Sequence, residues 1–293
     1  MAVTERDPYS GHMTTGHEWN GIKELNRPVP RMYWWFLSAT VLFAVVWWVL
    51  MPAWPLGVTY TRGLLDVDQR TTVAQRLAEG AARRAEWVNR IEAADFAEVQ
   101  ADEDLMRIVR QSGQTLFRDN CSVCHGIDAR GGPGYPNLVA GAWLWGGDPQ
   151  TIAETLRVGI NADHPETRFS EMAAFGRDQM LDRQAIQDVV AYVRSLSDPS
   201  VAEGGNADAV AAGAEVFAEN CAACHGDDGH GSTELGAPNL ADGFWIYGGD
   251  RQSIYRTVYR GRRGHMPAWE DRLTPVQRKM LALYVIDLGQ RGE

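Results

Sequence analysis

The sequence contains the pentapeptide CSVCH at residues 121–125 and the pentapeptide CAACH at residues 221–225, and these two motifs use all four of its cysteines. The pattern Cys-x-x-Cys-His is typical of c-type haem attachment, because two thiols can bond the vinyl groups of one haem while the adjacent histidine binds its iron. The sequence therefore predicts two covalently bound haems c, with His125 and His225 as iron ligands. The attaching thiols are those of Cys121, Cys124, Cys221 and Cys224.

Other uses of four cysteines fit this pattern less well. A structural zinc site needs four Cys or His ligands close together, whereas each motif supplies only two thiols and the other motif is far away in the sequence. A thioredoxin-like dithiol lies in a βαβ setting, which neither motif shows. Disulfide bonds would leave the histidine after each second cysteine as a coincidence.

The two motifs belong to an internal repeat. In each copy a phenylalanine precedes the first cysteine by four residues, and the motif is followed by Pro-Asn-Leu, a tryptophan and Gly-Gly-Asp in the same order. The tryptophans, Trp143 and Trp245, are expected to be core residues against the haem. Gly-Gly-Asp, at residues 146–148 and 248–250, is expected to form a turn that leads to a helix N-cap.

Each copy resembles the cytochrome c fold, in which a C-terminal helix crosses the N-terminal helix of the same domain. A copy of this size is small for a single core, so a buried haem is expected to supply much of the apolar volume. The expected haem domains are residues 104–198 and 207–293, joined by a polar linker at residues 199–206. The fold class is expected to be mainly α.

Each copy also offers a methionine as the second axial ligand of its haem. A thioether opposite histidine favours ferrous iron and raises the reduction potential. Met266 lies in GHMPAW at residues 264–269 and aligns with Met172 in the first copy, where Met180 and His164 are alternative ligands. The other interpretation of either aligned methionine is a side chain that only fills the core.

An apolar segment precedes the repeat. Residues 33–51 (YWWFLSATVLFAVVWWVLM) contain no charge and no proline, and at about 1.5 Å per residue they nearly span the roughly 30 Å hydrocarbon core of a membrane. Tryptophans stand at both ends, where aromatic rings favour the headgroup level. A cleaved signal peptide would have a shorter apolar core, followed by small residues. The expected parts are an extended arm at residues 1–32, a transmembrane anchor at 33–54 and a helical linker at 55–103.

The haem motifs decide the expected orientation. Basic residues lie on both sides of the span, so the positive-inside rule decides little. Because covalent haem attachment belongs to an exported, oxidising compartment, the arm is expected in the cytoplasm and the repeat in the periplasm, with the anchor in the bacterial inner membrane. The formal net charge of −10 argues against nucleic acid as a partner. It fits either attraction to a cationic protein partner or simple solubility.

Two segments outside the haem motifs carry a more specific resemblance. GHEWNGIKELNRPVPR at residues 16–31 and MPAWP at residues 51–55 are similar to segments of subunit III of the cbb3-type cytochrome c oxidases, the CcoP or FixP family. The resemblance covers essentially the whole chain, with a mild departure at Ala173, where the second copy has proline. The resemblance of each copy to the cytochrome c fold implies that the carbonyls of Pro136 and Pro238 orient the proximal imidazoles.

The resemblance also implies a function. The subunit would accept electrons from a donor cytochrome c and pass them through its two haems to a monohaem subunit. From there they would reach the catalytic haem-copper subunit, which reduces oxygen to water and pumps protons. No catalytic residue is expected here, because one span without an intramembrane histidine cannot hold a haem-copper pair.

Other functions use the same haem chemistry. The nearest alternative is a free-standing, membrane-anchored dihaem cytochrome that carries electrons between a bc complex or a periplasmic dehydrogenase and an oxidase. A haem-based gas sensor would need an open coordination position and an output domain, and the sequence shows no such domain. Both irons are expected to be six-coordinate and closed to oxygen.

Overall fold

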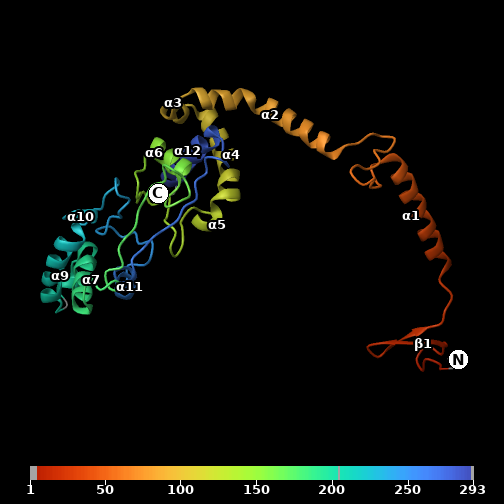
Figure 1. Cartoon of the computed structure of the whole chain (residues 1–293), viewed down its shortest axis with the longest axis horizontal. Coiled ribbons are helices and arrows are strands. Elements are labelled where there is room, and N and C mark those ends of the chain that lie inside the picture. The colour runs from red at the N-terminus through yellow and green to blue at the C-terminus, as the bar shows by residue number, and fades with distance from the viewer. Residues whose placement is uncertain (1–4, 204, 292–293) are drawn as a thin grey trace. The chain divides into compact units, whose positions relative to one another are not determined.

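The computed structural model describes residues 5–203 and 205–291 and is mainly α-helical (Figure 1). The chain divides into two compact units, Met1–Arg83 and Arg84–Glu293. The first contains a β-hairpin and an apolar helix, and the second contains both Cys-x-x-Cys-His motifs. The mainly α fold class predicted from the sequence is confirmed.

A β-hairpin lies near the start of the described part of the first unit. Strands β1 (Thr14–Trp19) and β2 (Ile22–Leu25) are antiparallel. They are joined by Asn20 and Gly21, which have φ angles of 51° and 84°. Two consecutive positive φ angles are what a tight hairpin turn requires, and Asn-Gly is the dipeptide that adopts them most readily. The N-terminal arm, predicted as extended, therefore turns back on itself.

The apolar segment forms helix α1 (Arg31–Leu50), which begins directly after Pro30. The helix buries none of its residues against the rest of the chain. By length and composition it is a candidate membrane span. An apolar helix that leaves its side chains exposed is suited to lipid, where no polar face is needed.

Helix α2 (Gln69–Ala93) crosses the boundary between the two units. Its last turns belong to the core of the second unit, where Ile91 is fully buried. Helix α3 (Phe96–Ala101) follows and starts with a capping box formed by Asp95 and Glu98, which satisfies free N–H groups at its first turn. The segment predicted as a helical linker therefore ends as part of the core of the second unit.

The rest of the second unit repeats one succession of helices. Each copy has a long helix, a one-turn helix that carries the motif, a middle helix and a C-terminal helix. The first copy consists of α4 (Glu103–Asn120), α5 (Ser122–His125), α6 (Pro149–Val158) and α7 (Arg183–Ser197). After α8 (Ser200–Glu203), the second copy consists of α9 (Ala207–Asn220), α10 (Ala222–His225), α11 (Arg251–Arg260) and α12 (Pro275–Arg291). The N-caps expected from Gly-Gly-Asp are confirmed at Asp148 and Asp250.

The two copies exchange their C-terminal helices. Helix α7 packs against α9 and α11 of the second copy, and α12 packs against α4 and α6 of the first (Figure 1). Glycines permit the close crossings: a Cβ atom at Gly113 would lie 2.7 Å from the Cβ of Tyr284. In the same way, a Cβ atom at Gly213 would lie 2.9 Å from the Cβ of Tyr192. The prediction that each C-terminal helix crosses the N-terminal helix of its own copy is therefore wrong.

The length of the connection explains the exchange. Helix α7 ends at Ser197 and α9 begins at Ala207, and a short connection makes consecutive helices antiparallel neighbours. Because the copies are similar in sequence, α9 offers α7 the same kind of surface that α4 offers α12. The aromatic ring centroids lie 6.0 Å apart in the pair Phe117 and Tyr284 and 5.1 Å apart in the pair Tyr192 and Phe217.

Candidate functional site

Each Cys-x-x-Cys-His motif forms a single helical turn directly after a long helix. The backbone N–H of His125 donates to the carbonyl of Cys121 at 3.0 Å, and His225 forms the same bond with Cys221 at 3.0 Å. Residues three and four positions apart lie on one face of a helix, so the two thiols and the imidazole of a motif share a face. The structure thus brings the predicted residues of each motif together.

Backbone carbonyls orient the two motif histidines. Nδ1 of His125 lies 3.2 Å from the carbonyl oxygen of Pro136, and Nδ1 of His225 lies 3.0 Å from that of Pro238. Since a carbonyl oxygen only accepts, Nδ1 carries the proton and donates it, which leaves the lone pair of Nε2 for a metal. The two carbonyl contacts implied by the resemblance are confirmed.

Burial sets the charge of the groups in each motif. It lowers the pKa of His125 and of His225, while the hydrogen bond to the proline carbonyl acts in the opposite direction. The imidazoles are therefore neutral at neutral pH, which is the form that binds a metal. Burial also raises the pKa of Cys121 and of Cys221 to about 11. A thiol with so high a pKa is a weak nucleophile, which argues against a catalytic redox dithiol.

Apolar side chains pack around each motif, and we call the two core clusters that contain Cys121 and Cys221 the first and the second pocket. In the first pocket, which surrounds Cys121, Phe117 is buried and Leu138 and Trp143 pack against the same core. The corresponding side chains of the second pocket, which surrounds Cys221, are Phe217, Leu240 and Trp245. The predicted core positions of the two tryptophans are confirmed. Apolar walls beside two thiols and a neutral imidazole fit a haem, which is a large apolar disc with an iron at its centre.

Each pocket receives its methionine from the other copy. Met266 packs against the core of the first pocket, and Met172 packs against the core of the second. Backbone pairs fix both loops: the N–H of Met266 donates to the carbonyl of Ile160 at 2.9 Å, and that of Met172 to the carbonyl of Arg262 at 2.8 Å. Each methionine, expected as a ligand for the motif of its own copy, thus packs in the structure against the core that contains the motif of the other copy, because the methionine loops move with the exchanged helices.

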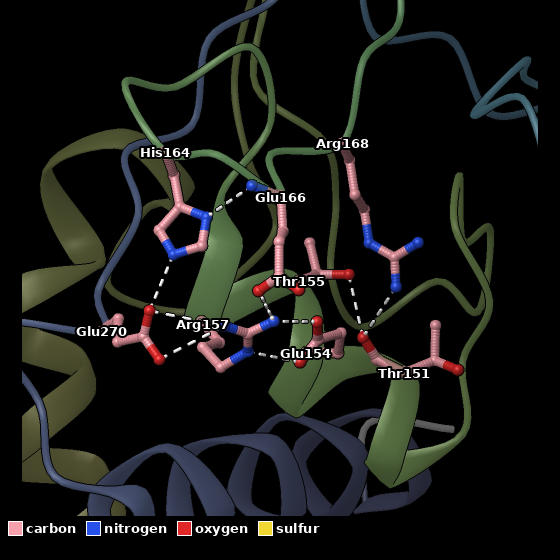
Figure 2. Close-up of polar contacts among 8 residues, drawn as sticks. All are labelled: Thr151, Glu154, Thr155, Arg157, His164, Glu166, Arg168 and Glu270. Carbon is pink, nitrogen blue, oxygen red and sulfur yellow. Dashed lines mark hydrogen bonds and ion pairs between the residues drawn. The ribbon is translucent and has the colours of Figure 1, made fainter.

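The alternative ligands of the first copy lie outside both pockets. Both ring nitrogens of His164 have partners (Figure 2): Nε2 lies 2.7 Å from Oε2 of Glu270, and Nδ1 accepts from the backbone N–H of Glu166 at 3.0 Å. Met180 leaves 56% of its surface exposed. Neither residue is part of the described core of either pocket.

A glycine beside each methionine loop gives a testable prediction. Gly159→Ala is expected to lower the free energy of unfolding by about 1–3 kcal/mol. The added Cβ atom would lie 2.5 Å from the carbonyl oxygen of Met266, and the backbone has a φ of +68° there. Chemical denaturation measures the effect. The control is Gly132→Ala, where the added atom would have no neighbour within 4 Å; equal stabilities of the two variants would contradict the prediction.

Family models match three parts of the chain. The model described as the N-terminal domain of cytochrome oxidase-cbb3, FixP, matches residues 11–58, which include the hairpin and α1. The model described as cytochrome c matches residues 111–197. The model described as cytochrome c oxidase, cbb3-type, subunit III matches residues 208–285. The two copies of the repeat are therefore cytochrome c domains, and such domains bind haem c.

Known relatives are similar over nearly the whole chain. The cbb3-type cytochrome c oxidase subunit FixP of Bradyrhizobium sp. (strain ORS 278) is 44% identical over 288 residues, covering 98% of each chain. The subunit CcoP of Azospirillum brasilense is 41% identical over 296 residues, covering 99% of each. The subunit CcoP of Cereibacter sphaeroides is 43% identical over 279 residues, covering 94% of each. With its apolar N-terminal helix and its cytochrome c domains, the chain belongs to the FixP/CcoP family of cbb3-type cytochrome c oxidase subunits.

Proposed function

We propose that this chain is the dihaem electron-transfer subunit of a cbb3-type cytochrome c oxidase. It accepts electrons from a donor cytochrome c and relays them to the monohaem subunit, which passes them to the catalytic haem-copper subunit. The observation that carries the proposal is the pair of equivalent pockets in one unit, each joining a Cys-x-x-Cys-His motif to a methionine. The printed names of the relatives support the oxidase context.

Residues of both copies hold each haem in this proposal. A bound haem c supplies a one-electron ferric/ferrous couple, and a thioether ligand raises its potential. Cys121 and Cys124 would hold the first haem, and His125 and Met266 would bind its iron. Cys221 and Cys224 would hold the second haem, and His225 and Met172 would bind its iron. With two protein ligands each iron would have no position open to oxygen, so the chain would act as a relay and not as the catalyst.

The protein groups around each pocket support this role. The carbonyls of Pro136 and Pro238 fix the imidazole orientation, so that Nε2 points away from its backbone partner. The paired backbone at Ile160 and Met266 fixes one methionine loop. Apolar walls exclude water, and a dry, rigid site changes little in structure when the charge of the iron changes.

The subunit crosses the membrane once in this proposal. The N-terminal arm lies in the cytoplasm, α1 spans the bacterial inner membrane, and the unit with the two motifs lies in the periplasm. The order along the chain supports this topology, because both motifs follow α1 and covalent haem attachment belongs to an oxidising compartment. Helix α1 contains no histidine, so the oxygen-reducing metals belong to a partner subunit.

Isolation of the intact complex tests the proposed function. Native membranes are extracted in mild detergent, separated on a native gel, stained for haem and analysed by mass spectrometry. The chain is expected to migrate with a monohaem cytochrome and a subunit of many membrane spans, and to carry a mass increase of two haems. Migration alone or with a bc complex would instead identify a free-standing shuttle.

A further inference from the structure

The side chain of Asn161 hydrogen-bonds the two loops that carry Met266 and Met172. Its Nδ2 donates to the carbonyl oxygen of Gly264 at 2.7 Å, and Gly264 lies two residues before Met266. The same Nδ2 donates to the carbonyl oxygen of Ser170 at 2.8 Å, and Ser170 lies two residues before Met172. One amide group therefore contacts both methionine loops, at the same number of residues before each methionine.

The amide of Asn161 uses all of its polar groups in these contacts. Besides the two bonds that Nδ2 donates, Oδ1 accepts from the backbone N–H of Ser170 at 3.2 Å. An asparagine side chain offers two N–H donors and one carbonyl oxygen, whereas an ionised aspartate of the same shape offers no donor. Asn161 is half-buried, so a lost bond is only partly replaced by water. The contacts therefore depend on the amide itself.

The backbone of Asn161 also suits this position. Its φ angle is +49°, in the left-handed region that asparagine adopts more readily than most residues. Its N–H donates to the carbonyl of Arg168 at 2.8 Å. The chain thus turns back after Asn161 and brings Ser170 next to the amide.

The second copy has a different residue at the aligned position. Since Gly159 aligns with Gly261, Asn161 aligns with Arg263. Arg263 reaches the first methionine loop through Glu171, with a distance of 3.7 Å between Nη1 and Oε2, and both side chains are exposed. An exposed ion pair of this kind contributes little. The amide of the first copy therefore provides the stronger side-chain link between the two loops.

Backbone pairs join the same two loops. Met266 and Ile160 exchange two hydrogen bonds, of 2.9 and 2.8 Å, and Met172 and Arg262 exchange two of 2.8 and 3.0 Å. Arg262 lies two residues before Gly264, which accepts from Asn161. Both methionines thus belong to one continuous hydrogen-bonded network, and such networks carry energetic coupling between sites.

We propose that Asn161 is a positioning residue that holds Met266 and Met172 in place for the two irons. The inference rests on the proposed function, since it needs both methionines as axial ligands. Asn161 acts through the loops and does not itself reach the iron. A methionine that leaves its iron must move its loop, and this movement breaks the hydrogen bonds from Asn161.

Imidazole titration of the ferric full chain tests the proposal. Imidazole displaces a thioether from ferric iron, which removes the near-infrared sulfur-to-iron charge-transfer band. Asn161→Gly keeps the backbone conformation without strain, and imidazole is expected to remove the whole band at an about tenfold lower concentration, because the amide no longer opposes displacement. Asn161→Asp, which keeps an acceptor for Ser170 but loses both donors, is expected to shift the titration in the same direction.

The matched control is Gln179→Gly. Gln179 lies in the same copy, has a φ angle of 57° and is exposed, so this substitution also removes a side chain at a positive φ. The imidazole titration of the control is expected to match that of the unsubstituted chain. Thermal unfolding of all variants is measured in parallel.

Two results would overturn the proposal. If the Asn161 variants unfold at a lower temperature but lose the band at the imidazole concentration of the control, Asn161 only closes its own loop. If half of the band shifts and half does not, Asn161 holds one methionine and not both. The unsubstituted chain is measured first: fewer than two haems per chain contradicts the proposed function, whereas two haems without the band contradict the methionine ligands and this inference with them.

Discussion

Met266→Ala is expected to abolish the near-infrared sulfur-to-iron charge-transfer band of the haem bound at Cys121, although Met266 belongs to the other copy of the repeat. The reason is the position of Met266 against the core that contains Cys121. Loss of the thioether also removes the ligand that favours ferrous iron, so the potential of that haem is expected to fall. The band is measured in the oxidised protein.

Single-haem variants make the assignment unambiguous. In a Cys221→Ser and Cys224→Ser background only the first haem is attached, and this background must itself show the band. Adding Met266→Ala is then expected to remove the band, and adding Met172→Ala to leave it. The reverse outcome would show that each haem takes the methionine of its own copy. In the protein with two haems, either substitution alone is expected to remove about half of the band intensity, because one of the two thioether ligands is lost.

A double-mutant cycle between Gly113 and Tyr284 is expected to show strong coupling. Gly113→Ala places a Cβ atom 2.7 Å from the Cβ of Tyr284, and such overpacking costs about 1–3 kcal/mol of unfolding free energy. Tyr284→Ala removes the ring that also meets the new methyl group, so the double variant is expected to be more stable than the sum of the single effects by about 0.5–3 kcal/mol. Denaturant unfolding provides the four free energies.

Tyr192 is the matched control for this cycle, because it is the residue of the first copy that aligns with Tyr284. If the copies exchange their C-terminal helices, Gly113→Ala and Tyr192→Ala should be additive to within about 0.3–0.5 kcal/mol. Coupling of Gly113 to Tyr192 instead would show that each domain closes on its own helix.

The exchanged arrangement also affects how the haems respond to substitutions. Each pocket contains a motif from one copy and a methionine loop from the other, so a change in one copy is expected to affect both pockets. Substitutions near Ile160, for example, act on the backbone that pairs with Met266. The two cytochrome c domains are therefore expected to unfold together, because neither pocket is complete without the other copy.

Sequence patterns were sufficient to predict those features that depend only on residues close together in the chain. The Cys-x-x-Cys-His pentapeptides place two thiols and an imidazole on one helical turn, whatever surrounds them. The caps at Asp148 and Asp250 depend only on the following turn. The carbonyl contacts of His125 and His225 came from the resemblance to the cytochrome c fold, since nothing in the spacing of the prolines indicates them.

Two contacts between an arginine and an aromatic ring illustrate what the patterns missed. Trp145 and Tyr247 occupy equivalent positions beside the Gly-Gly-Asp turns, and this alignment was the available signal. Arg168 and Arg262 do not occupy equivalent positions, because Arg262 follows Gly261 directly whereas Arg168 lies farther along a longer loop. Only the folded chain brings each arginine over its aromatic ring.

The sequence by itself determined the haem motifs, the apolar N-terminal helix, the two cytochrome c domains and the family. Tertiary structure alone decided which C-terminal helix packs against which N-terminal helix and which core each methionine joins. The physical reason is that the two copies are similar in sequence. A C-terminal helix could pack against α4 or against α9 with nearly the same local energy, since these two helices present similar surfaces. The short connection from Ser197 to Ala207 then selects the pairing of α7 with α9, and α12 takes the remaining position on α4.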